Sequence, residues 1–343
     1  MGDNSTNTSV YEPSDRPDVF EPVTLLFFPA LLLCLIGIPG TIKVIHFYGK
    51  QRKKVDGSTP TLLLGLAVYD MLSLVTIIPY ICLTINMKFT DIEGTKLFFC
   101  HYYVPNYLAR FPKYCSNFLL MVIATSRLYS VIRPHTWKKI FSRKVGLVCV
   151  LAVTFFVPLS LLPLAVEYSC SDIDNGTIAY HQYSDIGEKR GLYRTIYILN
   201  MILYFSFPLI TVIICNVALI AHMLHRMYNP VAALPLTSSQ ARELKMTKVV
   251  VVLTCIFVVC VSPLGIFYPL RGLDISPVPI YVYRAIMPVA TLLETINYSS
   301  NSLVYYIASS RFRNEVKQDV CCNRKSTAKV SPELPQLTNV RGK

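Results

Sequence analysis

Charged residues are scarce in this 343-residue sequence: Asp, Glu, Lys and Arg make up only 15% of it, against about 25% in average soluble domains. Apolar residues account for 53%. A soluble core of this size cannot bury that surplus, so part of it must face lipid. The composition therefore excludes a soluble enzyme, a disordered chain and a nucleic-acid-binding protein. The net charge of +13 then indicates basic cytoplasmic loops rather than a surface for nucleic acid.

Two further absences narrow the class of membrane protein. The sequence has no internal repeat, which counts against an inverted-repeat transporter, because the two halves would carry matching broken helices. It also has no metal-ligand spacing, nucleophile triad or phosphate-binding loop. Three of its six histidines are scattered in predicted loops, at positions 101, 135 and 181. We therefore do not expect an enzyme.

Long apolar runs are what the sequence has instead. A membrane-spanning helix needs about 20 mostly apolar residues. Seven runs qualify, namely residues 23–44, 61–87, 97–126, 145–166, 195–221, 249–270 and 280–310. The third contains Arg110 and Lys113, and the seventh contains Arg284 and Glu294, so these two are the weakest candidates. The sequence predicts an all-α membrane protein built as a bundle of seven transmembrane helices.

The distribution of Lys and Arg predicts the orientation of these spans. With the N-terminus outside the cell, 22 of the 33 basic residues fall on the cytoplasmic side, in agreement with the positive-inside rule. The three N-glycosylation sequons, at Asn4, Asn7 and Asn175, then lie on the outer side. We expect a multi-pass plasma-membrane protein with an extracellular N-terminus.

Four motifs occur in order within the spans. The second span holds a mid-membrane carboxylate, the third ends in an Arg followed by a Pro, the sixth reads Phe-x-x-Cys-x-x-Pro and the seventh Asn-x-x-x-Tyr. Their principal residues are Asp70, Arg127, Phe257, Pro263, Asn301 and Tyr305. In this order and at matching spacing over about residues 23–322, they resemble the motifs of rhodopsin-class (class A) G-protein-coupled receptors.

The motifs also depart from the common receptor pattern. Ser126 replaces the acid before Arg127, Val261 replaces the sixth-helix Trp, and the seventh-helix motif lacks its Pro. Pro208 falls at the fifth-helix bulge position, and Asn216 stands where many members have Tyr. A narrower resemblance rests on the Ser-Pro of the sixth helix, Asn216 after Pro208, a fourth span without Trp, residues 163–168 and the Pro-less seventh helix. Together these features resemble invertebrate FMRFamide-type neuropeptide receptors and related chemosensory groups.

The resemblance implies four parts of the chain, which are an extracellular glycosylated N-terminus (1–22), the seven-transmembrane bundle (23–308), a short amphipathic eighth helix (309–320) and a disordered cytoplasmic tail (321–343). Cys321 and Cys322 stand where palmitoyl chains would anchor the eighth helix to lipid. Cys100 and Cys170 occupy the two outer positions that the family joins by a disulfide.

A carboxylate in mid-membrane marks an ion or proton site by default. In the resembled family this Asp coordinates sodium with polar groups of the third and seventh helices. The matching residues here are Asp70, Ser116, Asn297 and Asn301. A structural sodium ion is the only cofactor that the resemblance implies. The alternative is a protonated, hydrogen-bonded Asp70 that holds no ion.

The resemblance gives Arg127, Phe257, Pro263 and Tyr305 roles in activation. In the family the Arg is tied to the neighbouring acid when inactive and engages the G protein when active. Ser126 cannot supply that ion pair, so we expect raised basal signalling. The alternative is that Arg127 is only an interfacial base whose side chain extends toward water.

Charges inside the bundle predict a ligand site. Arg110 and Lys113 lie three residues apart and share a helix face, at the depth of the family's ligand contacts. Isolated charges at this depth are very unfavourable, so we expect Glu294 to pair with Lys113 or Arg110. Residues from the sixth and seventh helices would line the upper wall, namely Tyr268, Arg271, Arg284 and Thr291. The alternative is a structural ion pair that never meets ligand.

The expected function is a receptor that passes the binding of an extracellular ligand to a heterotrimeric G protein. Arrestin and membrane lipid are the other partners that the resemblance implies. A retinal-binding opsin is excluded, because residues 280–310 contain no Lys for a Schiff base. A biogenic amine is disfavoured, because Ala109 and Arg110 replace the amine-binding Asp of the third helix. A neuropeptide is the favoured ligand, with a small chemosensory molecule or, outside receptors, a transporter or channel as alternatives.

Overall fold

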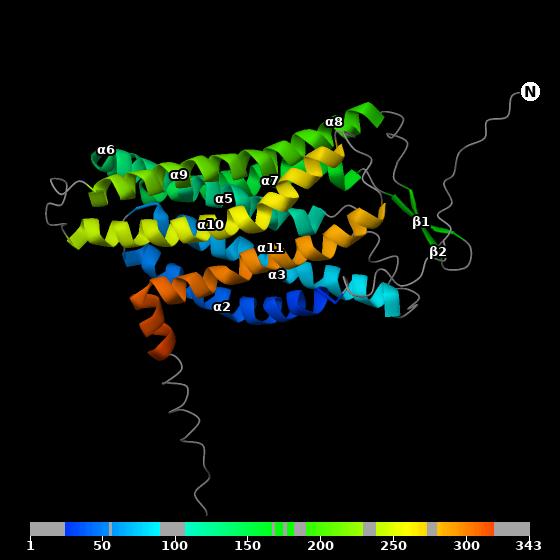
Figure 1. Ribbon diagram of the computed structural model, residues 1–343, viewed down its shortest axis with the longest axis horizontal. Helices are drawn as coiled ribbons and strands as arrows, with labels where there is room; N and C mark the ends of the chain where they lie inside the picture. Colours follow the sequence, from blue (N-terminus) through cyan, green and yellow to red (C-terminus); the bar gives the residue numbers. More distant parts are fainter. Residues whose placement is uncertain are drawn as a thin grey trace, which may run out of the picture.

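The computed structural model shows a bundle of long helices that run side by side (Figure 1). The residues that it describes are 25–54, 57–89, 107–166, 169–173, 177–181, 190–228, 238–272 and 280–318. The long helices are α2 (Phe27–Lys54), α3 (Thr59–Phe89), α5 (Tyr107–Ile132), α7 (Arg143–Val166), α8 (Arg190–Met201) continued through η2 (Ile202–Ser206) into α9 (Phe207–Tyr228), α10 (Ser238–Gly272) and α11 (Ile280–Ala308). With α8, η2 and α9 counted as one span, the described residues contain seven spans, and the predicted fold class is confirmed.

The helices extend beyond several of the predicted spans at the basic end of the bundle. α2 continues ten residues past the predicted end at residue 44, and α10 begins eleven residues before the predicted start at 249. The last turn of α2 carries Arg52, Lys53 and Lys54, which a helix C-terminus favours through its dipole. Hydropathy alone cannot detect such turns, because they lie outside the lipid.

The outer surface of the bundle is apolar and therefore suited to lipid rather than to water. On α7, Phe155 and Leu159 point outward and are 72% and 67% exposed, whereas Asp70 and Asn117 are buried within the bundle. Six of the seven spans are apolar enough to cross a membrane by composition alone, and α11 is not among them. α11 nevertheless packs against α2, α3 and α10, so its polar residues face the interior.

Small residues bring α2 and α11 into close contact. A Cβ atom added at Gly37 would lie 2.7 Å from Ser299 Cβ, and one added at Gly40 would lie 2.5 Å from Ser302 Oγ. Gly and Ser at such positions let two transmembrane helices approach closely and gain van der Waals contact. This packing holds the polar face of α11 toward the centre of the bundle.

Two short helices lie at the end of the bundle drawn on the left of Figure 1. The first, α6 (Pro134–Ile140), begins at Pro134, where the missing N–H is not needed. The second spans residues 310–318, after a break at Ser309, whose Oγ accepts a hydrogen bond from the Phe312 N–H at 3.3 Å as an N-cap. The predicted eighth helix is therefore present.

The eighth helix is fastened to the bundle by an aromatic contact. Phe312 is buried against Phe47 of α2, with ring centroids 5.2 Å apart in an edge-to-face arrangement. Lys50 also donates a hydrogen bond to Glu315 at 3.0 Å. The Phe312 ring thus packs against the bundle itself.

A β-hairpin that the sequence analysis missed lies at the opposite end. Strands β1 (Ser169–Ile173) and β2 (Thr177–His181) pair antiparallel, with Cys170 opposite Tyr180. The intervening sequence Asp174-Asn175-Gly176 contains the Asn-Gly pair that is typical of hairpin turns. That dipeptide was the signal from which the hairpin could have been predicted.

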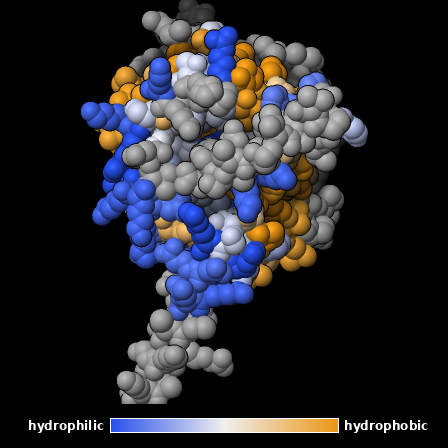
Figure 2. All heavy atoms as spheres, turned by 90° about the vertical axis from the view of Figure 1, so that its left-hand side faces the viewer, coloured by the Kyte–Doolittle hydropathy of each residue, from blue (hydrophilic) through white to orange (hydrophobic). Residues whose placement is uncertain are grey.

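Figure 2 views the bundle from the end that carries α6 and shows hydrophilic residues gathered over it, with hydrophobic residues along the flank. Exposed basic residues of this end come from four different helices and include Lys53, Lys54, Lys139, Lys144 and Lys245. Such a basic end is typical of the cytoplasmic side of a membrane protein.

Candidate functional site

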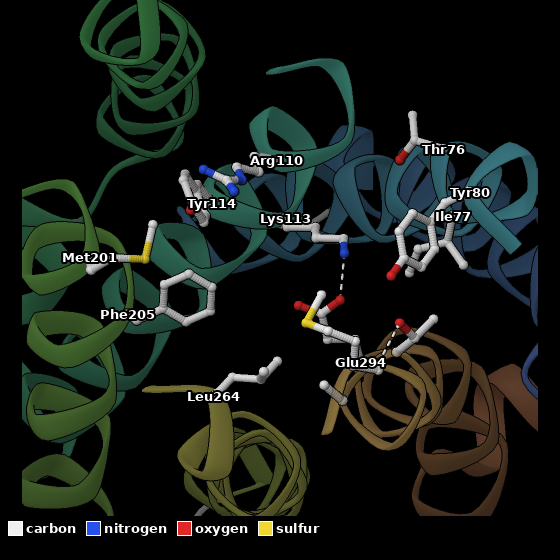
Figure 3. A pocket seen from close by; sticks show the side chains of 13 residues that line it. Thr76, Ile77, Tyr80, Arg110, Lys113, Tyr114, Met201, Phe205, Leu264 and Glu294 are labelled. Carbon is white, nitrogen blue, oxygen red and sulfur yellow. Dashed lines mark hydrogen bonds and ion pairs between the residues drawn. The ribbon is translucent and has the colours of Figure 1, made fainter. Parts of the chain in front are cut away.

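A pocket opens between the helices in the half of the bundle away from the basic end (Figure 3). Its cavity volume is about 50 Å³. α3, α5, the α8–η2 segment, α10 and α11 all contribute to its wall. The lining side chains are Thr76, Ile77, Tyr80, Arg110, Lys113, Tyr114, Met201, Phe205, Leu264, Met287, Ala290, Thr291 and Glu294.

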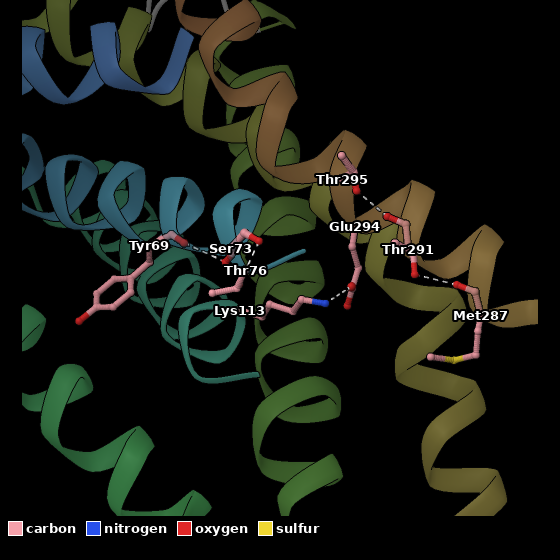
Figure 4. A network of polar contacts seen from close by, with 8 residues as sticks. All are labelled: Tyr69, Ser73, Thr76, Lys113, Met287, Thr291, Glu294 and Thr295. Carbon is pink, nitrogen blue, oxygen red and sulfur yellow. Dashed lines mark hydrogen bonds and ion pairs between the residues drawn. The ribbon is translucent and has the colours of Figure 1, made fainter. Parts of the chain in front are cut away.

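An ion pair crosses this pocket from α5 to α11. Lys113 Nζ donates a hydrogen bond to Glu294 Oε2 (Figures 3 and 4), and the two side chains are only 16% and 10% exposed. The predicted pairing of Glu294 with one of the two bases is confirmed, and Lys113 is the partner. Two opposite charges at this depth are far less unfavourable together than either would be alone.

Hydroxyl groups around the ion pair are satisfied within their own helices (Figure 4). Thr291 and Thr295 of α11 donate to the carbonyls of Met287 and Thr291 at 2.9 and 2.7 Å. On α3, Ser73 donates to the Tyr69 carbonyl at 2.8 Å. These contacts leave the carboxylate of Glu294 to the ammonium group of Lys113.

Four of the seven predicted ligand residues, Arg110, Lys113, Thr291 and Glu294, line this pocket. The other three, Tyr268, Arg271 and Arg284, lie on α10 and α11, but their side chains are outside the described residues. The helix faces inferred from residue spacing were therefore correct for the residues that can be placed.

The fifth span contributes two aromatic residues to the pocket region that the sequence analysis did not single out. The π-helical segment η2 (Ile202–Ser206) buries two consecutive side chains, Tyr204 and Phe205. Tyr204 stacks on Tyr114 with ring centroids 4.6 Å apart, and Phe205 lines the pocket. A regular α-helix would place two consecutive residues about 100° apart.

Pro208 explains why this segment is stable. A helical N–H at position 208 would donate to the carbonyl of Tyr204, but proline has none. Asn117 of α5 supplies the missing donor, because its Nδ2 lies 3.3 Å from the Tyr204 carbonyl oxygen. The bulge expected near Pro208 is thus present and ends at Ser206, two residues before it.

A second polar site lies deeper in the bundle around Asp70 of α3. Asp70 is buried and accepts hydrogen bonds from Ser116 Oγ at 2.6 Å and from Asn301 Nδ2. Asn297 is buried on α11 one turn before Asn301. The structure therefore joins three of the four residues predicted for a sodium site. Carboxylate, hydroxyl and amide oxygens are the ligands that hard cations prefer, so the residue set fits sodium.

At the basic end, Arg127 of α5 is almost fully buried, with 1% of its surface exposed. Its Nη2 donates a hydrogen bond to Thr59 Oγ1, and its Cζ lies 5.7 Å from the centre of the Trp137 ring. Ser126 turns away, since its hydroxyl donates to the Ile123 carbonyl at 2.8 Å. Trp137 was missed because it lies on the short helix α6, whose seven residues show no periodic pattern.

The other predicted activation residues lie on α10 and α11. Phe257 and Tyr305 are buried, and Tyr305 packs edge-to-face on Tyr48 of α2 with ring centroids 5.2 Å apart. Pro263 faces outward, and α10 remains one helix through it. Tyr48 also interacts electrostatically with Arg127, so it links Tyr305 to the surroundings of that guanidinium group.

Between α9 and α10, a hydrogen bond joins two buried side chains. Thr254 Oγ1 donates to Asn216 Oδ1 at 2.7 Å. Asn216, which stands where many receptors of the resembled family have Tyr, therefore has a polar partner on the sixth span. The contact fixes the spacing of these two helices in their basic halves.

Several predicted sites lie outside the described residues. They are the side chains of the disulfide pair Cys100 and Cys170, the sequons at Asn4, Asn7 and Asn175, and the palmitoylation candidates Cys321 and Cys322. All of these remain predictions from the sequence.

Comparison with known proteins places the whole bundle in one family. Residues 34–323 match the family described as "Serpentine type 7TM GPCR chemoreceptor Srw". The chain is 24% identical to "G-protein coupled receptor 183-A" of Danio rerio over 90% of this chain and 83% of that protein. It is 25% identical to "Neuropeptide Y receptor type 2" of Mus musculus, covering 92% and 83%, and 25% identical to "Somatostatin receptor type 5" of Rattus norvegicus, covering 86% and 77%.

Proposed function

The chain belongs to the Srw family of serpentine seven-transmembrane G-protein-coupled receptors, and from this premise we propose that its extracellular ligand is a neuropeptide. It is a multi-pass membrane protein that signals at the cell surface to heterotrimeric G proteins. Its family members and relatives are receptors and not enzymes.

The pocket is the observation that carries the peptide proposal. It combines the Lys113–Glu294 ion pair and Arg110 with the aromatic rings of Tyr80, Tyr114 and Phe205. Peptides present charges of both signs and aromatic side chains, so they match such a lining better than a purely apolar molecule would. Two of the relatives named above are receptors for peptides by their printed names, neuropeptide Y and somatostatin.

A small chemosensory molecule is the second candidate, because the matching family is described as chemoreceptors. Such a ligand would bind deep in the same pocket. The resemblance to FMRFamide-type receptors favours the peptide, since it rests on several departures within the motifs themselves.

The remaining features belong to the same proposal. We place the N-terminus outside the cell with its three glycans, and a disulfide between Cys100 and Cys170 over the pocket. Sodium would bind at Asp70, Ser116, Asn297 and Asn301, where it supplies a positive charge to the buried carboxylate. Palmitoyl chains on Cys321 and Cys322, and arrestin binding at the basic end, complete the proposal.

A ligand screen tests the peptide proposal. Cells expressing the chain are exposed to a library of amidated and free-acid peptides and, separately, to small volatile and soluble odorants, with calcium and cyclic AMP as readouts. We expect responses to peptides that are lost in Glu294→Gln at matched surface expression. Responses to small molecules alone, or peptide responses unchanged in Glu294→Gln, would contradict the proposal.

A further inference from the structure

The resting position of Arg127 needs an explanation that the receptor motif does not provide. In the resembled family the acid before this Arg holds it, but position 126 is Ser, and its hydroxyl bonds to the Ile123 carbonyl of its own helix. Arg127 is nevertheless almost fully buried. A buried guanidinium group requires compensating contacts from other elements.

Side chains of α3 and α6 make contact with this guanidinium group. Thr59, at the start of α3, accepts a hydrogen bond from Nη2. The indole ring of Trp137 on α6 lies 5.7 Å from Cζ, within the distance of a cation–π interaction, and Trp is the best ring for that interaction. The Trp137 ring is itself only 7% exposed, so water does not weaken the attraction.

The surrounding backbone fixes the Trp137 ring in this position. Within α6, the Trp137 N–H donates to the Arg133 carbonyl at 3.0 Å, and the Phe141 N–H donates to the Trp137 carbonyl at 2.8 Å. The Ser58 N–H then donates to the Phe141 carbonyl at 3.1 Å, which ties the end of α6 to the start of α3, where Thr59 lies. Thr59 and Trp137, which both contact Arg127, therefore belong to one connected piece of structure.

Neighbouring groups favour the same ring orientation. The Phe141 ring stacks on Trp137 with centroids 6.3 Å apart and an interplanar angle of 19°. Gly57, with a φ of +126°, lies beside the ring edge, since a Cβ there would be in ordinary van der Waals contact with Trp137 Cη2 at 4.0 Å. The ring is held by packing and not by its indole N–H, which has no hydrogen-bond partner among the described residues.

We propose that Trp137, together with Thr59, takes the place of the missing acid and holds Arg127 in the resting state. Trp137 is a positioning residue that acts through Arg127. Activation then requires Arg127 to leave the face of the indole ring. The inference depends on coupling to G proteins but not on the identity of the ligand, so its test stands apart from the peptide screen.

Basal signalling in the absence of ligand is the main test. Wild type, Trp137→Leu and Trp137→Phe are compared at matched surface expression with a panel of G-protein activation sensors. We expect Trp137→Leu to raise basal signalling by about three- to tenfold, and Trp137→Phe to raise it less because a weaker ring remains. Phe27→Leu is the control, since it removes an equally buried ring at the opposite end of the bundle.

A rescue variant separates positioning from general damage to the fold. In Trp137→Leu combined with Ser126→Asp, the restored acid should hold Arg127 and return basal signalling to the wild-type level. A loss of packing alone would not be repaired by a carboxylate at position 126. Unchanged basal signalling in both Trp137 variants, or no rescue by Ser126→Asp, would overturn the proposal.

Fluorescence provides a second measurement that needs no Trp137 variant. Trp137 is the only tryptophan in the 343 residues, so the emission of the purified receptor reports on this ring alone. Arg127→Met should shift the emission and increase quenching by iodide, whereas Arg127→Lys should preserve both, because it keeps the charge. Identical emission in wild type and Arg127→Met, or equal changes in the Met and Lys variants, would contradict a cation–π contact.

Discussion

Among single residues, the buried ionisable side chains matter most for the folding and signalling of this receptor. Lys113 and Glu294 neutralise each other in the pocket, Asp70 is held by Ser116 and Asn301, and Arg127 is held by Thr59 and Trp137. In each case the charged form of the side chain would be very unfavourable alone, because neither lipid nor the protein interior solvates it. Each partner is therefore expected to affect both folding and signalling.

A charge swap in the pocket distinguishes a ligand contact from a structural ion pair. Lys113→Met alone leaves Glu294 as an unpaired buried charge, and we expect it to destabilise the fold by about 3–5 kcal/mol, measured as lost surface expression and a lower unfolding temperature. Lys113→Glu combined with Glu294→Lys should restore expression but not agonist potency, because the charges that meet the ligand are exchanged. Wild-type potency in the double variant would refute the ligand role of this pair.

The residues that the sequence could and could not reveal differ in a physical way. Arg110, Lys113 and Glu294 lie on long helices, where a spacing of three or four residues determines a shared face, and the ion pair follows from that. Trp137 lies on a helix of only seven residues between two spans, and its contact with Arg127 depends on how that segment folds back. No local pattern encodes such a contact.

At the scale of elements, an irregular segment of the fifth span places aromatic side chains at the pocket. The π-helical segment η2 rotates Tyr204 and Phe205 inward together, and Asn117 satisfies the carbonyl that Pro208 leaves without an N–H donor. Sequence could predict a distortion near Pro208, because proline has a fixed effect on the helix. It could not predict which helix supplies the compensating amide, since that depends on tertiary packing.

A double-mutant cycle tests this account of the bulge. Asn117→Leu leaves the Tyr204 carbonyl unpaired, which should lower the free energy of unfolding by about 1–3 kcal/mol. In a Pro208→Ala background the restored N–H at position 208 can bond to that carbonyl, so Asn117→Leu should be less damaging there. Thermal unfolding of the four purified proteins gives the coupling. Strictly additive effects would show that Asn117 and Pro208 act independently.

The contact between α2 and α11 gives a second prediction at this scale. Gly40→Ala would place a Cβ 2.5 Å from Ser302 Oγ, and overpacking of this kind typically destabilises by about 1–3 kcal/mol. Gly49→Ala is the matched control, because a Cβ there meets nothing within 4 Å. Ala is a better helix former than Gly, so the control should be neutral or slightly stabilising. Equal unfolding temperatures for the two variants would contradict the close packing.

At the scale of the whole molecule, α5 connects the two functional ends. It carries Lys113 in the pocket, Ser116 at the Asp70 site and Arg127 at the basic end. The number of spans and the order of these sites along α5 follow from the sequence alone. The hairpin over the outer end and the helix α6 do not, because short elements in loops depend on the bundle that they cover.

The outer cysteines give a prediction at this scale that rests on sequence. If Cys100 and Cys170 form a disulfide, Cys100→Ala and Cys170→Ala should each reduce surface expression and agonist response. In small secreted domains the loss of a native disulfide lowers the free energy of unfolding by about 2–5 kcal/mol, and we expect a loss of that order here. Cys255→Ala is the control, since Cys255 is a free, outward-facing thiol. Normal expression and response in both variants would show that the pairing is wrong.

Nucleotide exchange on purified G proteins shows whether this bundle activates them through Arg127. The purified receptor is reconstituted in lipid vesicles with each class of heterotrimeric G protein, and the uptake of a non-hydrolysable GTP analogue is measured for wild type, Trp137→Leu and Arg127→Ala. We predict that Trp137→Leu accelerates exchange on at least one G protein above wild type, and that adding Arg127→Ala to it returns exchange to the rate of the G protein alone. Exchange that no form of the receptor accelerates, or that persists without Arg127, would contradict the account.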